Sequence, residues 1–265
     1  MNKILIIAQN TAQETAAYRL NFVLWRARSV IRYLLSYFLW TAILSGVAGA
    51  VGGYSRAQML TYLTFGYIVM TFVLATRTQD LGGEINEGKL SNALLRPQSF
   101  FQYLIGREIG DKVVNLVFSV AEVGLLLFIL HPPVLFQSNP EVLLLTLLAV
   151  IGSTIMYFLL SLLMSLIAFW TNDIWAVRFL FFMCLEFMSG SLIPIDLFPG
   201  IWRSIVLSTP FPYVMFFPAK IYLGGMSVSD LRQGFMVLSI WIIGLSLLAY
   251  VAWRRGLKSY GADGR

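Results

Sequence analysis

Long apolar runs alternate with a few polar segments along the chain, and this pattern predicts an all-α membrane protein. A run of about 18–20 apolar residues is long enough to cross a bilayer as a helix. We expect such crossings at Ile31–Val51, Met59–Thr76, Val113–Leu130, Val142–Trp170, Ile174–Ile193 and Phe235–Trp253. The pattern therefore predicts six transmembrane helices in one domain that covers residues 1–265.

The residues before the first run follow a different pattern. In residues 11–29, apolar positions recur at helical spacing with arginines between them, and Tyr18 and Trp25 suit the headgroup layer. We predict an amphipathic helix that lies in the inner interface. The alternative interpretation is that this helix extends the first span into water.

Prolines interrupt residues 194–231, between the fifth and sixth runs. Proline lacks a backbone donor and breaks helices. The apolar stretches Ile201–Leu207 and Tyr213–Leu223 are too short to cross a membrane. We expect short re-entrant helices on the outer side, covered by protein or lining a wet cavity.

Composition and charge agree with a membrane location. The chain is 58% hydrophobic and 12% charged, whereas a soluble domain carries about 25% charged residues. The net charge is +6, but the outer segments hold only Arg56, Arg203, Lys220 and Arg232 of the 19 basic residues. Basic residues are retained on the cytoplasmic side, so we expect both termini there. The positive charge then reflects topology and anionic lipid, and no nucleic-acid partner is expected.

Catalytic signatures are missing from the sequence. It contains one histidine, His131, and one cysteine, Cys184, and it has no G-x-x-x-x-G-K-[ST], H-E-x-x-H or G-x-S-x-G motif. We therefore expect a chain that is no enzyme and that binds no metal or cofactor itself.

One long polar segment, residues 80–112, separates the second and third runs. Glu84 to Leu95 can form an amphipathic helix that Pro97 ends, and a second helix can run from Ser99 into the third span. Such a segment would be a rigid rod in the cytoplasm that docks a partner. A solvated charged loop is the alternative.

Two glutamates stand inside apolar runs, Glu122 in the third span and Glu186 in the fifth. An ionised carboxylate in mid-bilayer costs about 2.5–3.5 kcal/mol or more, so it must face protein or water or become protonated. Both could line a translocation path with Phe182 and Met183 and attract a cationic or polar substrate. Alternatively, each could be protonated and hydrogen-bonded to a neighbouring helix, with the aromatic residues simply packing.

Two stretches resemble the ABC-2 type permeases. Glu87-Gly88-Lys89-Leu90 followed by Leu94-Leu95-Arg96-Pro97 resembles the E-x-G-x-L-x-x-x-L-L-x-x-P stretch in that family's first inner loop, with one residue fewer before the proline. Residues 189–199 and Thr209-Pro210 resemble the family's outer re-entrant region.

The resemblance implies a permease subunit of a bacterial exporter in the inner membrane that moves a hydrophobic or amphipathic small molecule or a lipid. The substrate would be cationic if Glu122 and Glu186 bind its charge. It implies two copies of an ATPase that bind ATP and Mg²⁺, and a second permease, identical or dissimilar. The residues that would contact the ATPase are Glu84, Glu87, Gly88, Leu90, Leu94 and Arg96. Two other functions stay open: an ion-coupled secondary transporter that uses Glu122 or Glu186, and a membrane scaffold without transport.

Overall fold

The computed structural model describes the chain except for residues 1–2, 18, 47–48, 96–98 and 261–265. Regular structure in the described residues is helical, apart from one isolated β-bridge between Val51 and Tyr54. The helices in the first half of the chain are α1 (Lys3–Ala17), α2 (Arg19–Ser45), α3 (Arg56–Leu74), α4 (Thr78–Asn86), α5 (Leu90–Leu94) and α6 (Phe100–Leu130). The remaining helices are α7 (Pro140–Leu166), η1 (Ile167–Phe169), α8 (Trp175–Met188), η2 (Ile195–Leu197), α9 (Gly200–Ser208), η3 (Phe211–Val214), α10 (Phe216–Tyr222) and α11 (Val228–Ser259).

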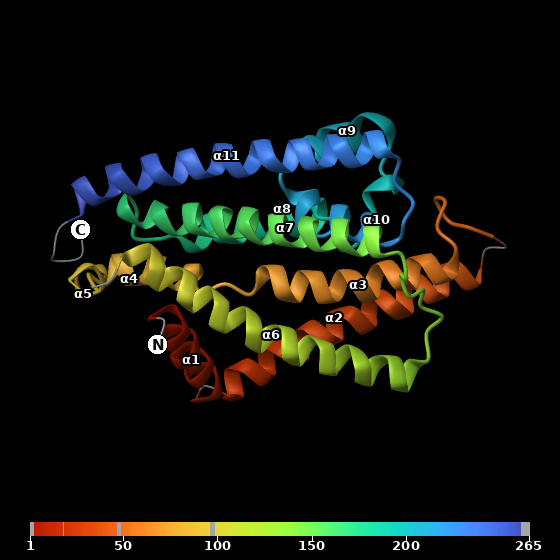
Figure 1. Ribbon diagram of the computed structural model, residues 1–265, viewed down its shortest axis with the longest axis horizontal. Helices are drawn as coiled ribbons and strands as arrows, with labels where there is room; N and C mark the ends of the chain where they lie inside the picture. Colours follow the sequence, from red (N-terminus) through yellow and green to blue (C-terminus); the bar gives the residue numbers. More distant parts are fainter. Residues whose placement is uncertain (1–2, 18, 47–48, 96–98, 261–265) are drawn as a thin grey trace.

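The long helices run side by side along one axis, and the short helices gather at its two ends (Figure 1). Helices α4 and α5 lie at the end that also holds α1 and the end of α11, whereas α9 and α10 lie at the opposite end. We call these the terminal end and the re-entrant end. Buried apolar side chains form two clusters, one centred on α7 and one on α2 and α3.

Four helical segments are long and apolar enough to cross a membrane, counting only the residues that the structure describes. They are Arg56–Asn86, Phe100–Leu130, Pro140–Phe169 and Val228–Ser259, and they correspond to the second, third, fourth and sixth predicted spans. An all-α membrane protein is therefore confirmed.

The first and fifth predicted spans are shorter than expected. The first lies in α2, which ends at Ser45 rather than at Val51. Helix α8 has 14 residues, about 21 Å at 1.5 Å per residue, against a hydrocarbon core of about 30 Å. It ends at Met188 because Gly190 turns the chain with a φ of +84°.

The predicted interfacial helix at residues 11–29 is divided between two helices. Its first part belongs to α1 and its second part to α2. Helix α1 packs closely on α6, because Gly110 has no side chain: a Cβ there would lie 2.4 Å from the carbonyl oxygen of Ala8. The prediction of one helix over 11–29 is corrected accordingly.

The predicted rod from Glu84 to Leu95 is also divided. Helix α4 ends at Asn86 and α5 begins at Leu90, with Gly88 between them at a φ of +73°. Glycine adopts this left-handed conformation without steric cost, so the chain can turn here. The second predicted helix, from Ser99 into the third span, is confirmed as α6, for which Ser99 is the N-cap residue.

Candidate functional site

A cavity of about 790 Å³ lies between α2, α3 and α8. Each of these helices contributes residues that recur every three or four positions and so share one face. From α2 these are Trp25, Arg28, Ser29, Arg32, Tyr33 and Ser36. The walls extend from α1 and the start of α4 at the terminal end to Ser191 and Met215 near the re-entrant segments.

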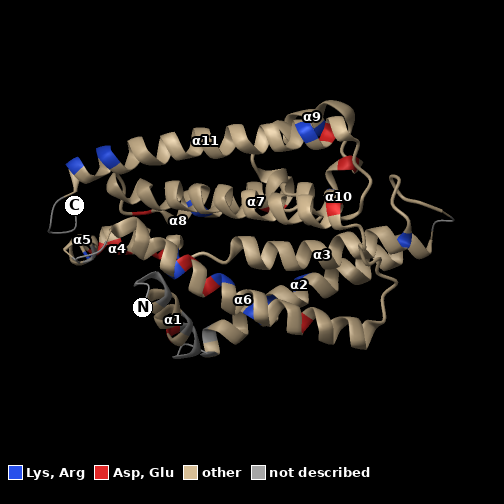
Figure 2. Ribbon diagram, in the orientation of Figure 1, with Lys and Arg blue, Asp and Glu red and all other residues tan. Residues whose placement is uncertain are grey.

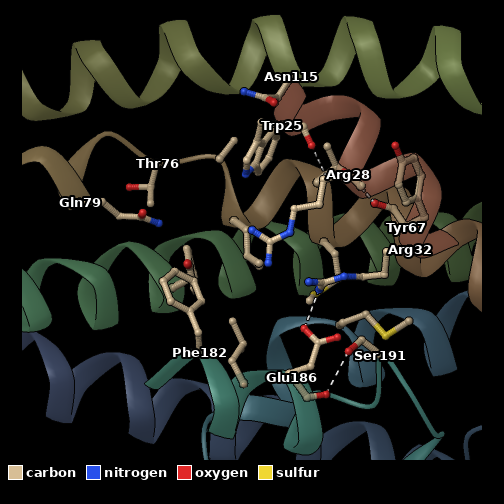
Figure 3. Close-up of a pocket in the computed structure, with 18 of the residues that line it drawn as sticks. Trp25, Arg28, Arg32, Tyr67, Thr76, Gln79, Asn115, Phe182, Glu186 and Ser191 are labelled. Atoms are coloured by element: carbon tan, nitrogen blue, oxygen red, sulfur yellow. Dashed lines mark hydrogen bonds and ion pairs between the residues drawn. The ribbon is translucent and has the colours of Figure 1, made fainter. Parts of the chain in front are cut away.

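Three of the four residues predicted for a translocation path lie on the cavity wall. Phe182, Met183 and Glu186 all come from α8. The Glu186 carboxylate accepts a hydrogen bond from Nη1 of Arg32 at 2.6 Å, across the cavity from α8 to α2 (Figure 3). The cavity therefore has a charged pair on an otherwise largely apolar α8 wall.

Glu122 lies behind the wall, and it is absent from the residues that line the cavity. Its carboxylate accepts hydrogen bonds from Nε of Arg26 at 2.8 Å and from the Tyr67 hydroxyl at 2.6 Å, and it forms a second contact with Arg26. Asn115 accepts a further hydrogen bond from Arg26 at 3.3 Å. Glu122 thus belongs to a buried ion-pair network, and it does not face Glu186 across the cavity.

The partners of both glutamates are arginines of α2, for which the sequence predicted only a place on the inner side of the membrane and contact with anionic lipid. A polar stripe on α6 was also missed. Arg107, Glu108, Asp111, Lys112, Asn115 and Glu122 recur at intervals of one, three, four or seven residues. This spacing places them on one helical face. Polar residues at such intervals beside an apolar run are a signal that sequence alone could have supplied.

Two residues of this stripe bind both sides of the break between α3 and α4. Lys112 Nζ donates to the carbonyl oxygens of Phe72, Val73 and Ala75, the last at 2.7 Å, where α3 ends. Glu108 accepts from the Arg77 backbone N–H at 2.9 Å and from the Thr76 hydroxyl, where α4 begins. Helix ends leave such carbonyls and N–H groups without partners, and a cation at the C-terminus and an anion at the N-terminus are favourable.

A cluster of ion pairs joins α4 to the start of α6. Arg107 donates to Glu84 at 2.8 Å and to Asp80 at 2.9 Å, and Arg77 donates to Asp111 at 3.0 Å. Glu84, one of the residues predicted to contact the ATPase, is therefore engaged within the chain. The cluster fixes α4 against α6, and Arg77, Asp80 and Asp111 of this cluster also line the cavity.

The turn between α4 and α5 is the exposed part of this region. Glu87 and Lys89 are both exposed and pair with each other, and this contact raises the pKa of the Lys89 ammonium. Leu90 is fully buried, whereas Leu94 is 41% and Leu95 83% exposed. Among the predicted contact residues, Glu87, Gly88 and Leu94 lie at the tip of the terminal end, and Arg96 falls outside the described residues.

The re-entrant end carries a second cluster of charges. Asp196 pairs with Lys220 at 2.8 Å and with Arg203 at 3.0 Å, and it accepts a hydrogen bond from the Tyr54 hydroxyl at 2.6 Å. Burial opposes ionisation of Asp196, but the hydrogen bonds from Lys220 and Tyr54 and the charges of Lys220 and Arg203 outweigh it and hold the pKa of this carboxyl below its ordinary value. Nearby, the Tyr62 hydroxyl donates to the Gly190 carbonyl at 2.7 Å.

Replacement of Asp196 by asparagine should lower the free energy of unfolding by about 2 kcal/mol at pH 7, because two cations lose their counter-charge. A carboxyl with a depressed pKa stabilises the fold fully above its unfolded value of about 3.9 and loses that contribution as the pH falls through the folded value. The difference between wild type and variant should therefore shrink between pH 7 and pH 3 in unfolding measurements in detergent.

Asp173→Asn is the matched control, because an amide oxygen can replace the carboxylate that accepts from the Trp175 N–H at 2.9 Å. A stability difference for Asp196→Asn that stays constant from pH 7 to pH 3 would contradict the assignment of this carboxylate as an ionised partner.

Residues 30–264 match the sequence profile of a family described as ABC-2 family transporter protein. This match covers most of the chain, and the chain belongs to this family. It is thus a multi-pass membrane permease subunit and not itself the catalytic component, and the family implies an ABC transporter with an ATPase partner. A search of curated proteins gave no match to the chain. The described residues contain no group of histidine, cysteine, aspartate or glutamate side chains that could hold a metal ion.

Proposed function

We propose that the chain is one of two permease subunits of an ATP-driven exporter in a bacterial inner membrane. It would move a hydrophobic or amphipathic small molecule or a lipid out of the cytoplasm or the inner leaflet. One observation carries this proposal. The cavity extends toward the terminal end, where α4 and α5 lie, and the Asp196 cluster and the Gly190 turn occupy the opposite end. Such an arrangement suits a state that loads its substrate from the cytoplasm.

The orientation follows from the distribution of charge. The basic residues Arg56, Arg203, Lys220 and Arg232 belong to the start of α3 and to the re-entrant end, and most of the others belong to the terminal end (Figure 2). By the positive-inside rule the terminal end faces the cytoplasm. In this orientation α2 and α8 complete a body of six crossing helices, and the shorter α8 relies on the re-entrant helices to reach the outer surface.

Coupling to the ATPase is assigned to the turn between α4 and α5. Its exposed polar pair, Glu87 and Lys89, and the exposed Leu94 and Leu95 can together contact a partner protein. Two ATPase copies, which bind ATP and Mg²⁺, would each contact one permease, and the second permease is an identical or a dissimilar chain. Movement of α4 would reach the cavity through the ion pairs that join α4 to α6.

An ion-coupled secondary transporter is a weaker explanation. It requires Glu122 or Glu186 to bind and release a proton. Each carboxylate is already paired with an arginine, so its protonation would leave that arginine without a counter-charge. A scaffold without transport would leave the cavity without a role.

The coupling assignment is tested by Gly88→Pro and Glu87→Arg in cells that express the whole transporter. Proline cannot adopt the φ of +73° found at Gly88, and arginine reverses the exposed charge at position 87. We expect normal membrane insertion, loss of ATPase copurification in mild detergent and at least a tenfold loss of ATP-dependent transport, a change of about 1.4 kcal/mol or more.

Two matched variants serve as controls. Asparagine tolerates the left-handed conformation, so Gly88→Asn should keep coupling, and Ser138→Arg adds a charge in the exposed loop before α7 at the opposite end. If Gly88→Pro and Glu87→Arg copurify with the ATPase and transport like the wild type, the turn between α4 and α5 is not the coupling element.

A further inference from the structure

One arginine that lines the cavity has no counter-charge among the residues that the structure describes. Arg28 lies on the face of α2 that lines the cavity, and Figure 3 shows its side chain pointing into the open space between α2 and α8. The structure gives it no ion pair or hydrogen bond with the part of the chain that it describes, whereas Arg26 and Arg32 on the same helix both have carboxylate partners.

Most acidic groups that line the cavity are already neutralised by other cations. Glu186 pairs with Arg32 at 2.6 Å. Asp111 pairs with Arg77 at 3.0 Å. The other lining aspartate, Asp80, pairs with Arg107 at 2.9 Å. These carboxylates are therefore poor sites for a cationic ligand.

Glu14 is the remaining carboxylate on the wall, and it too lacks an ion-pair partner among the described residues. It belongs to α1, which lies at the terminal end (Figure 1). Arg28 lies further along α2, facing the α8 wall. Within the part of the chain that the structure describes, the interior of the cavity thus offers one unpaired positive charge.

The wall opposite Arg28 is apolar apart from Glu186, which Arg32 neutralises. Phe179, Phe182 and Met183 of α8 line it, and Leu63 and Met70 of α3 continue it. A volume of about 790 Å³ is within the range of about 300–1,000 Å³ that is typical of pockets for drug-sized ligands. A ligand that fills this space would place an apolar body against α3 and α8 and a polar group against α2.

We propose that the cavity binds an anionic amphiphile, whose carboxylate or phosphate group pairs with Arg28 and whose apolar body lies against α8. This inference rests on the proposed transport function and names its substrate class. The planar guanidinium can donate two parallel hydrogen bonds to a carboxylate or phosphate. Water leaves as the ligand enters, and the lower local dielectric strengthens the pair. One of the two alternatives drawn from the sequence was a cationic or polar substrate, because the arginine partner of Glu186 was not predicted.

The test is ligand binding to the purified full-length chain in a neutral detergent, followed by native mass spectrometry. The probes share one tail: dodecyl phosphate is anionic, dodecyltrimethylammonium is cationic and dodecanol is neutral. We expect one saturable site for dodecyl phosphate and at least about tenfold weaker binding of the other two. Inorganic phosphate, which has no tail, should also bind at least about tenfold more weakly.

Three variants locate the site. Arg28→Gln should weaken dodecyl phosphate binding by about tenfold or more, and Arg28→Glu should reverse the preference in favour of dodecyltrimethylammonium. Arg255→Gln, an exposed arginine near the end of α11, should bind like the wild type. Thermal unfolding of each variant shows whether it is folded, and Arg28 has no partner in the described fold whose loss would destabilise it.

The proposal is overturned if the anionic and cationic probes bind equally, or if Arg28→Gln binds dodecyl phosphate like the wild type. Equal binding of inorganic phosphate and dodecyl phosphate would show that the site does not require an apolar tail. The assay needs no ATPase and no transport. If the probes fail to bind as expected while the ATPase still copurifies, only the proposed substrate class is wrong. If the wild-type chain does not copurify with an ATPase but binds dodecyl phosphate, only the proposed exporter function is wrong.

Discussion

Replacement of Glu122 by leucine should lower the free energy of unfolding by about 3–5 kcal/mol, the cost of leaving one partner of a buried ion pair without the other. The partner is Arg26, of which only 5% of the side chain is exposed. Removal of the carboxylate also leaves the Tyr67 hydroxyl without its acceptor. Unfolding of the purified chain in mixed micelles of increasing denaturing detergent measures the change.

The double variant Arg26→Met, Glu122→Leu should recover most of this stability, because a buried pair can often be replaced by apolar residues at little cost. Glu141→Gln is the control. Glu141 lies in the first turn of α7, and loss of its charge should cost no more than about 1 kcal/mol. A Glu122→Leu variant as stable as the wild type would show that the ion pair does not hold α2 to α6.

Replacement of Lys112 by methionine should have a similar cost and a functional consequence as well. The variant loses the cation that binds the last carbonyls of α3 and leaves Glu108, which is 6% exposed, without its lysine. We expect a loss of about 3–5 kcal/mol and faster hydrogen exchange of the amides at the start of α4, beginning with Arg77. ATPase binding should persist while ATP-dependent transport falls, because the junction between α3 and α4 is no longer held against α6.

Lys89→Met is the control for the stability change of Lys112→Met, since Lys89 is exposed and an exposed ion pair contributes little to stability. If Lys112→Met shows wild-type hydrogen exchange at the α3–α4 junction and wild-type transport, this lysine does not hold that junction against α6.

The long spans could be predicted because their sequences are uninterrupted and their ends carry strong local signals. Helix α6 ends at Leu130, as expected, since Pro132 and Pro133 follow and His131 adopts a left-handed conformation at φ +46°. Helix α7 begins at Pro140, which Asn139 caps. These signals lie within a few residues of the helix ends that they determine.

The broken rod and the short α8 show where local pattern fails. Apolar residues continue on both sides of Gly88 and of Gly190, so their periodicity predicts an unbroken helix. A single glycine costs a helix only about 1 kcal/mol, and tertiary contacts decide whether the helix stops. At Gly190 a Cβ would lie 2.7 Å from the Tyr62 hydroxyl, a contact that joins residues 128 positions apart.

The partners of the two glutamates could not be deduced for the same reason. Arg26 and Glu122 are 96 positions apart, and Arg32 and Glu186 are 154 positions apart. Hydropathy places each glutamate in a span, but it does not say which cation from another helix meets it. The sequence thus indicated the presence of intramembrane carboxylates and missed the arginines that neutralise them.

The unequal exposure of these two ion pairs has a mechanical consequence. Arg26 and Glu122 are 5% and 19% exposed, whereas Arg32 and Glu186 are 45% and 21% exposed. Water can replace the partners of the second pair far more readily than those of the first. When the transporter changes state, α2 and α6 should therefore travel as one rigid unit, and the separation should develop between α2 and α8. Spin labels on α2 and α8 would then report a distance that varies over the transport cycle, while labels on α2 and α6 would not.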